Sequence, residues 1–125
     1  MQSVAQGRVS ARRLKENPKN MKIDLLWFDN CPNHNAAEEL VLETLSDFGV
    51  DAPINKINVP DLETGEKTHF PGSPTIRING LDIDPTYEDT GDYTPRCRVY
   101  FTSDGFKGLP EKAWIEDAVR EAVAK

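Results

Sequence analysis

The sequence has few of the features that mark secreted, membrane-spanning or nucleotide-binding proteins. It contains two cysteines in 125 residues, too few for the disulfide framework of a small secreted domain. No apolar run is long enough to span a membrane, and the first twenty residues lack the apolar stretch of a secretory signal. Phosphate loops, dinucleotide fingerprints and a Ser-His-Asp pattern are also missing. These absences predict a cytoplasmic protein whose reduced cysteines serve chemistry.

The charge is distributed unevenly along the chain. Residues 1–20 contain five basic side chains against Glu16, a net charge of +4, whereas the whole chain carries −6. Residues 21–125 therefore carry −10. A body this acidic repels phosphate backbones and anionic lipid headgroups, so we expect neither nucleic acid nor a membrane surface as a partner.

The chain is long enough for one domain with a substantial core but not for two. Residues 1–20 are polar and lack a periodic apolar pattern, so we predict a disordered or weakly helical N-terminal extension. Met21 is a candidate natural start, and a nucleic-acid arm or a transit peptide is the weaker interpretation of the preceding segment. The predicted domain spans residues 21–125.

The apolar pattern of this domain predicts an α/β fold. Residues 23–28 and 53–59 are predicted strands, and an amphipathic helix over 36–48 joins them and ends at Gly49. Because a helix connects them, the two strands are expected to lie parallel, as a βαβ unit. Residues 60–69 are expected to form a short helix or an irregular crossover.

The second half predicts antiparallel strands and a C-terminal helix. Asn79-Gly80 is a hairpin signal between strands at 75–78 and 81–83. An acidic loop over 84–95 and a further strand over 97–101 follow, and Asp84 is expected near the start of that loop. Ser103-Asp104-Gly105 predicts a turn, and Pro110 opens the last helix.

Cys31 is the strongest functional signal, because it lies between the first strand and the helix in Trp27-Phe28-Asp29-Asn30-Cys31-Pro32-Asn33-His34. Free backbone N–H groups and the dipole at a helix N-terminus favour a thiolate and lower a cysteine pKa. A buried cysteine that packs as a small hydrophobe is the alternative, but the polar loop favours an exposed thiolate. Trp27 and Asn33 flank the thiol and are candidate substrate-binding residues.

Three further residues are candidates for assisting Cys31. The expected strand directions bring Cys97 back to the same end of the sheet, where it could resolve a mixed disulfide; an ordinary strand residue is the alternative. His34 could donate a hydrogen bond to the thiolate or protonate a leaving thiolate, and its alternative is a solvent-facing helix residue. Asp29 is expected to cap the helix, and tuning of Cys31 is its alternative role.

A second signature, Gly72-Ser73-Pro74-Thr75-Ile76, completes a resemblance to the thioredoxin fold over residues 21–123. Together with Phe28-Asp29-x-Cys31-Pro32-Asn33-His34 and Cys97-Arg98-Val99-Tyr100, it resembles a group of small thioredoxin-like proteins. Some members are labelled alkylmercury-lyase-like, and some carry selenocysteine at the position matching Cys31.

The resemblance implies that Cys31 is the redox centre. It also implies that the Ser73–Pro74 peptide bond is cis and that the N–H and C=O of Ser73 pair with an extended substrate. The sequence departs from the thioredoxin pattern at His34, where thioredoxins have a second cysteine.

These features predict a thiol-dependent oxidoreductase of thioredoxin-like fold without a cofactor. Cys31 would attack the disulfide or peroxide-type bond of a protein or low-molecular-weight substrate, and Cys97 or an external thiol would resolve the product. Two alternatives stay open. One is a soft-metal or organomercurial binder that uses Cys31, His34 and Cys97 with Asp29 or Asp84. The other is a non-catalytic interaction module.

Overall fold

The computed structural model describes residues 21–29 and 31–124, so the predicted extension over 1–20 lies outside the described residues. The elements in chain order are β2 (Ile23–Trp27), α3 (His34–Asp47), β3 (Ile54–Asn58), α4 (Leu62–Thr68), β4 (Thr75–Ile78), β5 (Leu81–Asp82), β6 (Tyr100–Thr102), β7 (Gly105–Lys107) and α5 (Lys112–Ala124). A four-stranded mixed sheet has the order β3-β2-β4-β5. The predicted α/β class is confirmed.

The sheet follows the predicted connections. β2 pairs parallel with β3, as expected for a βαβ unit, and antiparallel with β4. β4 and β5 form the predicted hairpin, whose turn residues Asn79 and Gly80 have φ of 55° and 83°. Both angles are in the left-handed region, which asparagine and glycine tolerate best and which a two-residue hairpin turn requires.

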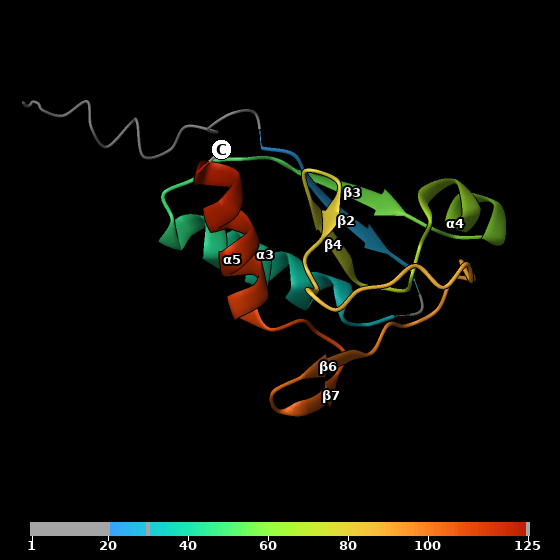
Figure 1. The fold of residues 1–125 in the computed structure, drawn as a ribbon. Coiled ribbons are helices and arrows are strands. Elements are labelled where there is room, and N and C mark those ends of the chain that lie inside the picture. Colours follow the sequence, from blue (N-terminus) through green and yellow to red (C-terminus); the bar gives the residue numbers. More distant parts are fainter. Residues whose placement is uncertain (1–20, 30, 125) are drawn as a thin grey trace, which may run out of the picture.

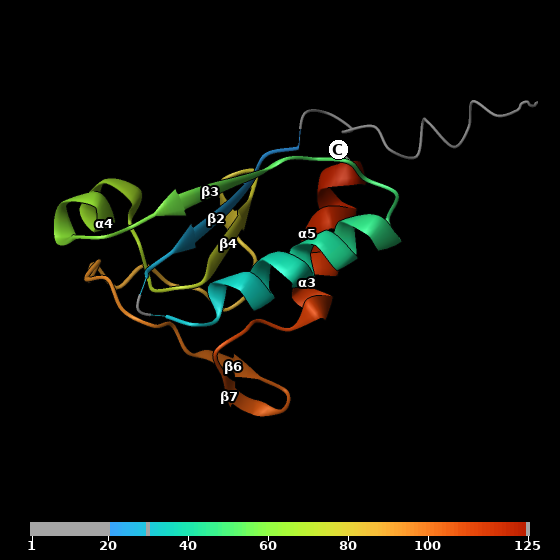
Figure 2. The ribbon, with the colours of Figure 1, turned by 180° about the vertical axis from the view of Figure 1, so that it is seen from behind.

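The two faces of the sheet carry separate cores. α3 and α5 lie together on one side, and α4 lies on the other (Figures 1 and 2). Alternate residues of β2 divide between them: Ile23 and Leu25 belong to the core under α3 and α5, whereas Leu26 packs with Val59 and Phe70 in the smaller core. This division explains why the β2 sequence is apolar on nearly every residue.

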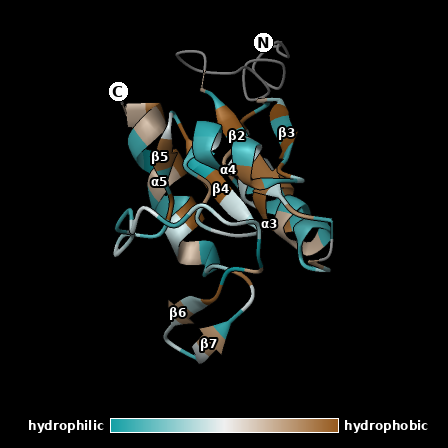
Figure 3. Ribbon diagram, turned by 90° about the vertical axis from the view of Figure 1, so that its right-hand side faces the viewer, coloured by the Kyte–Doolittle hydropathy of each residue, from teal (hydrophilic) through white to brown (hydrophobic). Residues whose placement is uncertain are grey.

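The predicted strand over 97–101 is wrong as a member of the main sheet. β6 begins only at Tyr100 and pairs with β7, a strand that the sequence reasoning missed. The β6–β7 hairpin projects away from the four-stranded sheet (Figure 3). Phe101 and Phe106 stack on each other with ring centroids 4.9 Å apart and are 71% and 74% exposed. Phe101 and Phe106 therefore reflect cross-strand pairing at the surface, whereas Tyr100 at the start of the hairpin is buried.

The helix starts also differ from the predictions. α3 begins at His34, with Asn33 at its N-cap position and no side-chain capping hydrogen bond, so the predicted Asp29 cap is wrong. α5 begins at Lys112, two residues after Pro110. Within residues 21–29 and 31–124, no helix is both long and apolar enough to cross a bilayer.

The loop before Cys97 packs closely on α4. A Cβ atom at Gly65 would lie 2.1 Å from the carbonyl oxygen of Tyr93. Alanine is the better helix former by about 1 kcal/mol, yet we expect Gly65→Ala to lower the free energy of unfolding by about 1–3 kcal/mol because the loop must move. Urea denaturation measures the effect, with Glu66→Ala on the exposed side of the same helix as the control. A Gly65→Ala protein as stable as wild type would contradict this packing.

Candidate functional site

Sheet pairing brings two loops together at one end of the sheet. Leu26, near the end of β2, pairs with Thr75, the first residue of the antiparallel β4. The loop that leaves β2 therefore lies beside the turn that enters β4. In the first loop the N–H of Cys31 donates to the carbonyl of Phe28 at 2.9 Å, which turns the chain toward α3.

A third segment, residues 96–98, completes the site by pairing with Ser73. The N–H of Ser73 donates to the carbonyl of Arg96, and the N–H of Arg98 donates to the carbonyl of Ser73, both at 2.7 Å. Cys97 is thus bridged to Ser73 in parallel fashion. The Ser73–Pro74 peptide bond is cis, as predicted.

The expectation that Ser73 offers a free backbone edge to a substrate is wrong for this structure. Its N–H and C=O are already occupied by the segment around Cys97. The sequence could not show this, because Cys97 was expected to begin a strand of its own. A substrate strand could pair with Ser73 only after residues 96–98 had moved.

The two cysteines lie next to each other, although they are far apart in the sequence. Both are free thiols. The side chain of Cys31 is 0% exposed, and its Sγ donates to the carbonyl oxygen of Ser73 at 3.3 Å. Cys97 is exposed and is bridged to the same Ser73, which brings the two cysteines together. The predicted proximity of Cys97 to Cys31 is confirmed, but the predicted exposure of Cys31 is wrong.

The neighbouring sulfur changes the acidity of the exposed thiol. The pKa of Cys97 is raised, first by its hydrogen bond with Cys31, then by partial burial and by the charge of Cys31. Two thiolates side by side repel each other, so the proton that remains is held more tightly. Cys97 is therefore less readily ionised when the Cys31 side chain is beside it.

His34 and Trp27 contact each other beside the backbone of Cys31. The Nδ1 atom of His34 lies 3.1 Å from the carbonyl oxygen of Cys31, and its ring stacks on Trp27 with centroids 4.7 Å apart. The predicted hydrogen bond from His34 to the Cys31 sulfur is wrong, because the ring is turned to the backbone. The two rings instead hold the loop that carries Cys31.

Asn33 lies farther along the loop, against the connection between β7 and α5. A Cβ atom added to Gly108 would lie 2.2 Å from the Nδ2 atom of Asn33. Asn33 also lines a cavity of about 260 Å³ together with Lys107 and Glu111. Its proposed role in substrate binding stays a prediction.

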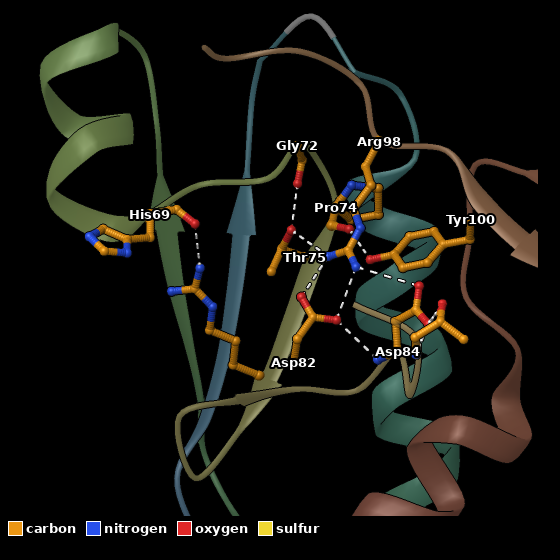
Figure 4. A network of polar contacts seen from close by, with 10 residues as sticks. His69, Gly72, Pro74, Thr75, Asp82, Asp84, Arg98 and Tyr100 are labelled. Atoms are coloured by element: carbon orange, nitrogen blue, oxygen red, sulfur yellow. Dashed lines mark hydrogen bonds and ion pairs between the residues drawn. The ribbon is translucent and has the colours of Figure 1, made fainter. Parts of the chain in front are cut away.

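Arg98 is the site residue that sequence reasoning missed. Its side chain is 8% exposed, and Nη1 and Nη2 donate to the two carboxylate oxygens of Asp82 at 2.7 and 3.0 Å (Figure 4). Nη2 also lies 3.7 Å from Oδ2 of Asp84, and the guanidinium carbon lies 4.3 Å from the centre of the Tyr100 ring. An arginine inside a predicted strand is the signal that could have found it, since a buried arginine needs carboxylate partners.

The same network reaches both sides of Pro74. Nη1 of Arg98 donates to Oγ1 of Thr75 at 3.1 Å, and Thr75 in turn donates to the carbonyl of Gly72 at 2.6 Å. The hydroxyl of Tyr100 donates to the carbonyl of Pro74. Burial raises the pKa of Tyr100 far above its usual range, so the phenol keeps its proton. Residues 72–75 are therefore tied to the segment that carries Cys97.

Across residues 21–29 and 31–124, no group of three or more His, Cys, Asp or Glu side chains is arranged to hold a metal ion. The predicted ligand set of Cys31, His34 and Cys97 with Asp29 or Asp84 does not assemble. Asp84 faces Arg98 instead. One buried polar atom of the site, Oγ of Ser73, has no hydrogen-bond partner among the described residues.

No family model, curated protein or solved structure matches this chain. Its function is therefore inferred from the residues of the site.

The raised pKa of Cys97 leads to a test of the thiol pair. We expect Cys97 to be alkylated with a pH midpoint above that of an ordinary thiol. In Cys31→Ala both the hydrogen bond and the neighbouring charge are lost, so the pKa of Cys97 should fall and its alkylation near pH 8 should become faster. Iodoacetamide labelling followed by peptide mass spectrometry measures the midpoint at Cys97, with Cys97→Ser as the background. A midpoint that Cys31→Ala leaves unchanged would contradict the contact.

Proposed function

We propose that this chain is a thiol–disulfide oxidoreductase of thioredoxin-like fold, in which Cys31 and Cys97 form the redox pair. The observation that carries the proposal is the nearness of the two free thiols: the Sγ of Cys31 donates to the carbonyl of Ser73, and Cys97 is bridged to the same residue. Neighbouring thiols need little further movement to form a disulfide.

The arrangement around the pair supports the thioredoxin-like assignment. A βαβ unit precedes a β-hairpin and a C-terminal helix, and the first strand of that hairpin is entered through a cis proline. The loop with Cys31 lies beside that proline, since the Sγ of Cys31 donates to the carbonyl of Ser73. This is the relation between thiol and proline that the resemblance implies.

The proposed reaction transfers two electrons from the protein to a substrate disulfide. The thiolate of one cysteine attacks a substrate sulfur, the substrate S–S bond breaks, and the first substrate thiolate leaves and takes up a proton. The second cysteine then attacks the mixed disulfide, forms the Cys31–Cys97 bond and releases the second substrate thiol. The protein is oxidised from dithiol to disulfide, and an external dithiol would reduce it again.

Exposure favours Cys97 as the residue that attacks first. An incoming disulfide can reach Cys97 from solvent, whereas the buried Cys31 side chain is closed off. Cys31 is in place to attack the resulting mixed disulfide from inside. This order reverses the roles that the sequence suggested. The raised pKa of Cys97 makes the first step slow at neutral pH.

The metal-binding alternative has one observation in its favour, because two adjacent thiols are suitable ligands for a soft metal ion or an organomercurial. A third ligand of the predicted set is missing from the described part of the chain. We favour redox chemistry for this reason. A protein or low-molecular-weight disulfide in a reducing compartment such as the cytoplasm is the proposed substrate.

Single-cysteine variants test the order of attack. In Cys31→Ser, an aromatic disulfide that releases a coloured thiolate should react at Cys97 and stop at the mixed disulfide, with one thiolate released. In Cys97→Ser we expect a rate at least about tenfold lower than in Cys31→Ser, because the remaining thiol is shielded. Wild type should release a second thiolate as the internal disulfide forms.

Different outcomes would contradict the order of attack and the redox pair itself. Equal rates in the two single-cysteine variants would contradict Cys97 as the entry point. A single release in wild type, with Cys97 left as a mixed disulfide, would contradict the redox pair itself. Denaturing each variant should equalise the reaction of its cysteine and serves as the control for intrinsic reactivity.

A further inference from the structure

We infer that Arg98 is a positioning residue that holds Cys97 against Cys31 and so determines how fast the internal disulfide forms. The inference rests on the proposed function and adds to it a residue that contacts neither sulfur. It starts from the way in which Cys97 is attached to the domain.

Cys97 lies in a segment that is not part of either sheet. β6 begins at Tyr100, and within the described residues 21–29 and 31–124 the segment has one ladder contact, the bridge to Ser73. The chain before it, over residues 84–95, is a mostly exposed connection without helix or strand. The two backbone hydrogen bonds of this bridge, each worth about 1 kcal/mol net, add to the packing of Tyr93 on Gly65 before the segment and to the buried Tyr100 after it.

The side chain of Arg98 supplies an anchor at the residue next to Cys97. It is buried next to an exposed cysteine, so the chain presents Cys97 outward while Arg98 is fixed inside. A guanidinium group that meets one carboxylate through two parallel hydrogen bonds has a defined orientation, which a single charge pair lacks. Asp82 lies in β5, so Arg98 ties the segment to the main sheet.

Arg98 also ties the segment to the turn that faces Cys31. Its contact with Thr75, and that of Thr75 with Gly72, join the guanidinium to the backbone before Pro74. A Cβ atom on Gly72 would lie 2.8 Å from the Cβ of Arg98, so the two backbones are already in close approach. Figure 4 shows the guanidinium between these residues and the two aspartates. The turn and the Cys97 segment are therefore held as one unit.

This anchoring has a chemical consequence for the second step of the reaction. When Cys31 attacks the mixed disulfide on Cys97, the step is intramolecular, and its rate depends on how often the two sulfurs meet. Groups joined by a flexible linker reach effective concentrations of about millimolar, and groups held in place reach far higher values. Releasing Arg98 should therefore slow this step.

Stopped-flow kinetics with the coloured aromatic disulfide separates the two steps. The first release depends on disulfide concentration, and the second, which forms the Cys31–Cys97 bond, does not. In Arg98→Met we expect the second rate constant to fall by about tenfold or more, with the first unchanged or faster. Arg98→Lys keeps the positive charge but cannot form the two parallel hydrogen bonds to Asp82, so it should give an intermediate value. Arg120→Met removes an exposed arginine paired with Asp117 and is the control.

A second variant is needed in case Arg98→Met alone fails to fold. Arg98→Met leaves Asp82 buried without its partner, so Arg98→Met combined with Asp82→Leu removes both charges of the pair. Circular dichroism and cooperative urea unfolding identify the folded variants. In these, the pH midpoint of Cys97 alkylation should also move to lower pH, because Cys97 spends less time beside Cys31.

Failure of the positioning role and failure of the proposed function give different results. A folded Arg98→Met/Asp82→Leu protein whose second step is as fast as in wild type would overturn the positioning role and leave the redox pair intact. A wild-type protein with no second release would overturn the proposed function and the positioning role together.

Discussion

The pairing of Ser73 with the chain around Cys97 is the interaction on which the site depends. Ser73 uses both of its backbone groups in this bridge, and its carbonyl oxygen also accepts the Cys31 thiol. One residue thus joins three loops that the sequence separates widely. Without the bridge, Cys31 would face an open backbone edge, and Cys97 would belong to a loose connection.

The bridge gives the domain an internal segment where the resemblance would place a substrate strand. The cysteine of that segment lies beside Cys31, much as the cysteine of a bound substrate would. The buried thiol is protected from small reagents, and the exposed thiol has a raised pKa. Under the proposed function both properties would restrain the reduced protein, and its reactivity would depend on how firmly residues 96–98 are held. The ion pair of Arg98 with Asp82 attaches this segment to the main sheet.

Much of the main sheet and its covering helix followed directly from local patterns. The apolar run of β2, the helix period of α3 and the Asn79-Gly80 turn each depend on neighbours in the sequence, and all three were correctly predicted. Pro74 was correctly expected to be cis only because of the resemblance, since cis bonds are rare even before proline. The strand directions correctly placed Cys97 near Cys31. They did so through a predicted strand over 97–101, whereas Cys97 is held by a single bridge to Ser73.

The missed features depend on contacts between distant residues. Cys31 is buried with its thiol on the carbonyl of Ser73, which lies far away in the sequence, and no pattern around Cys31 contains that information. The orientation of His34 follows from its stacking on Trp27, which the spacing of the two residues leaves undecided. In the sequence Arg98 looks like an ordinary strand residue, because its partners Asp82 and Asp84 are brought beside it only by the fold. Longer-range packing and the neutralisation of buried charge decided these points.

The most direct measurement is peptide mapping of wild-type protein equilibrated in glutathione buffers of graded redox potential. We expect one oxidised species, in which Cys31 and Cys97 are linked within a single chain and both thiols disappear together. An oxidised protein that carries glutathione on Cys97 while Cys31 remains a free thiol would contradict it.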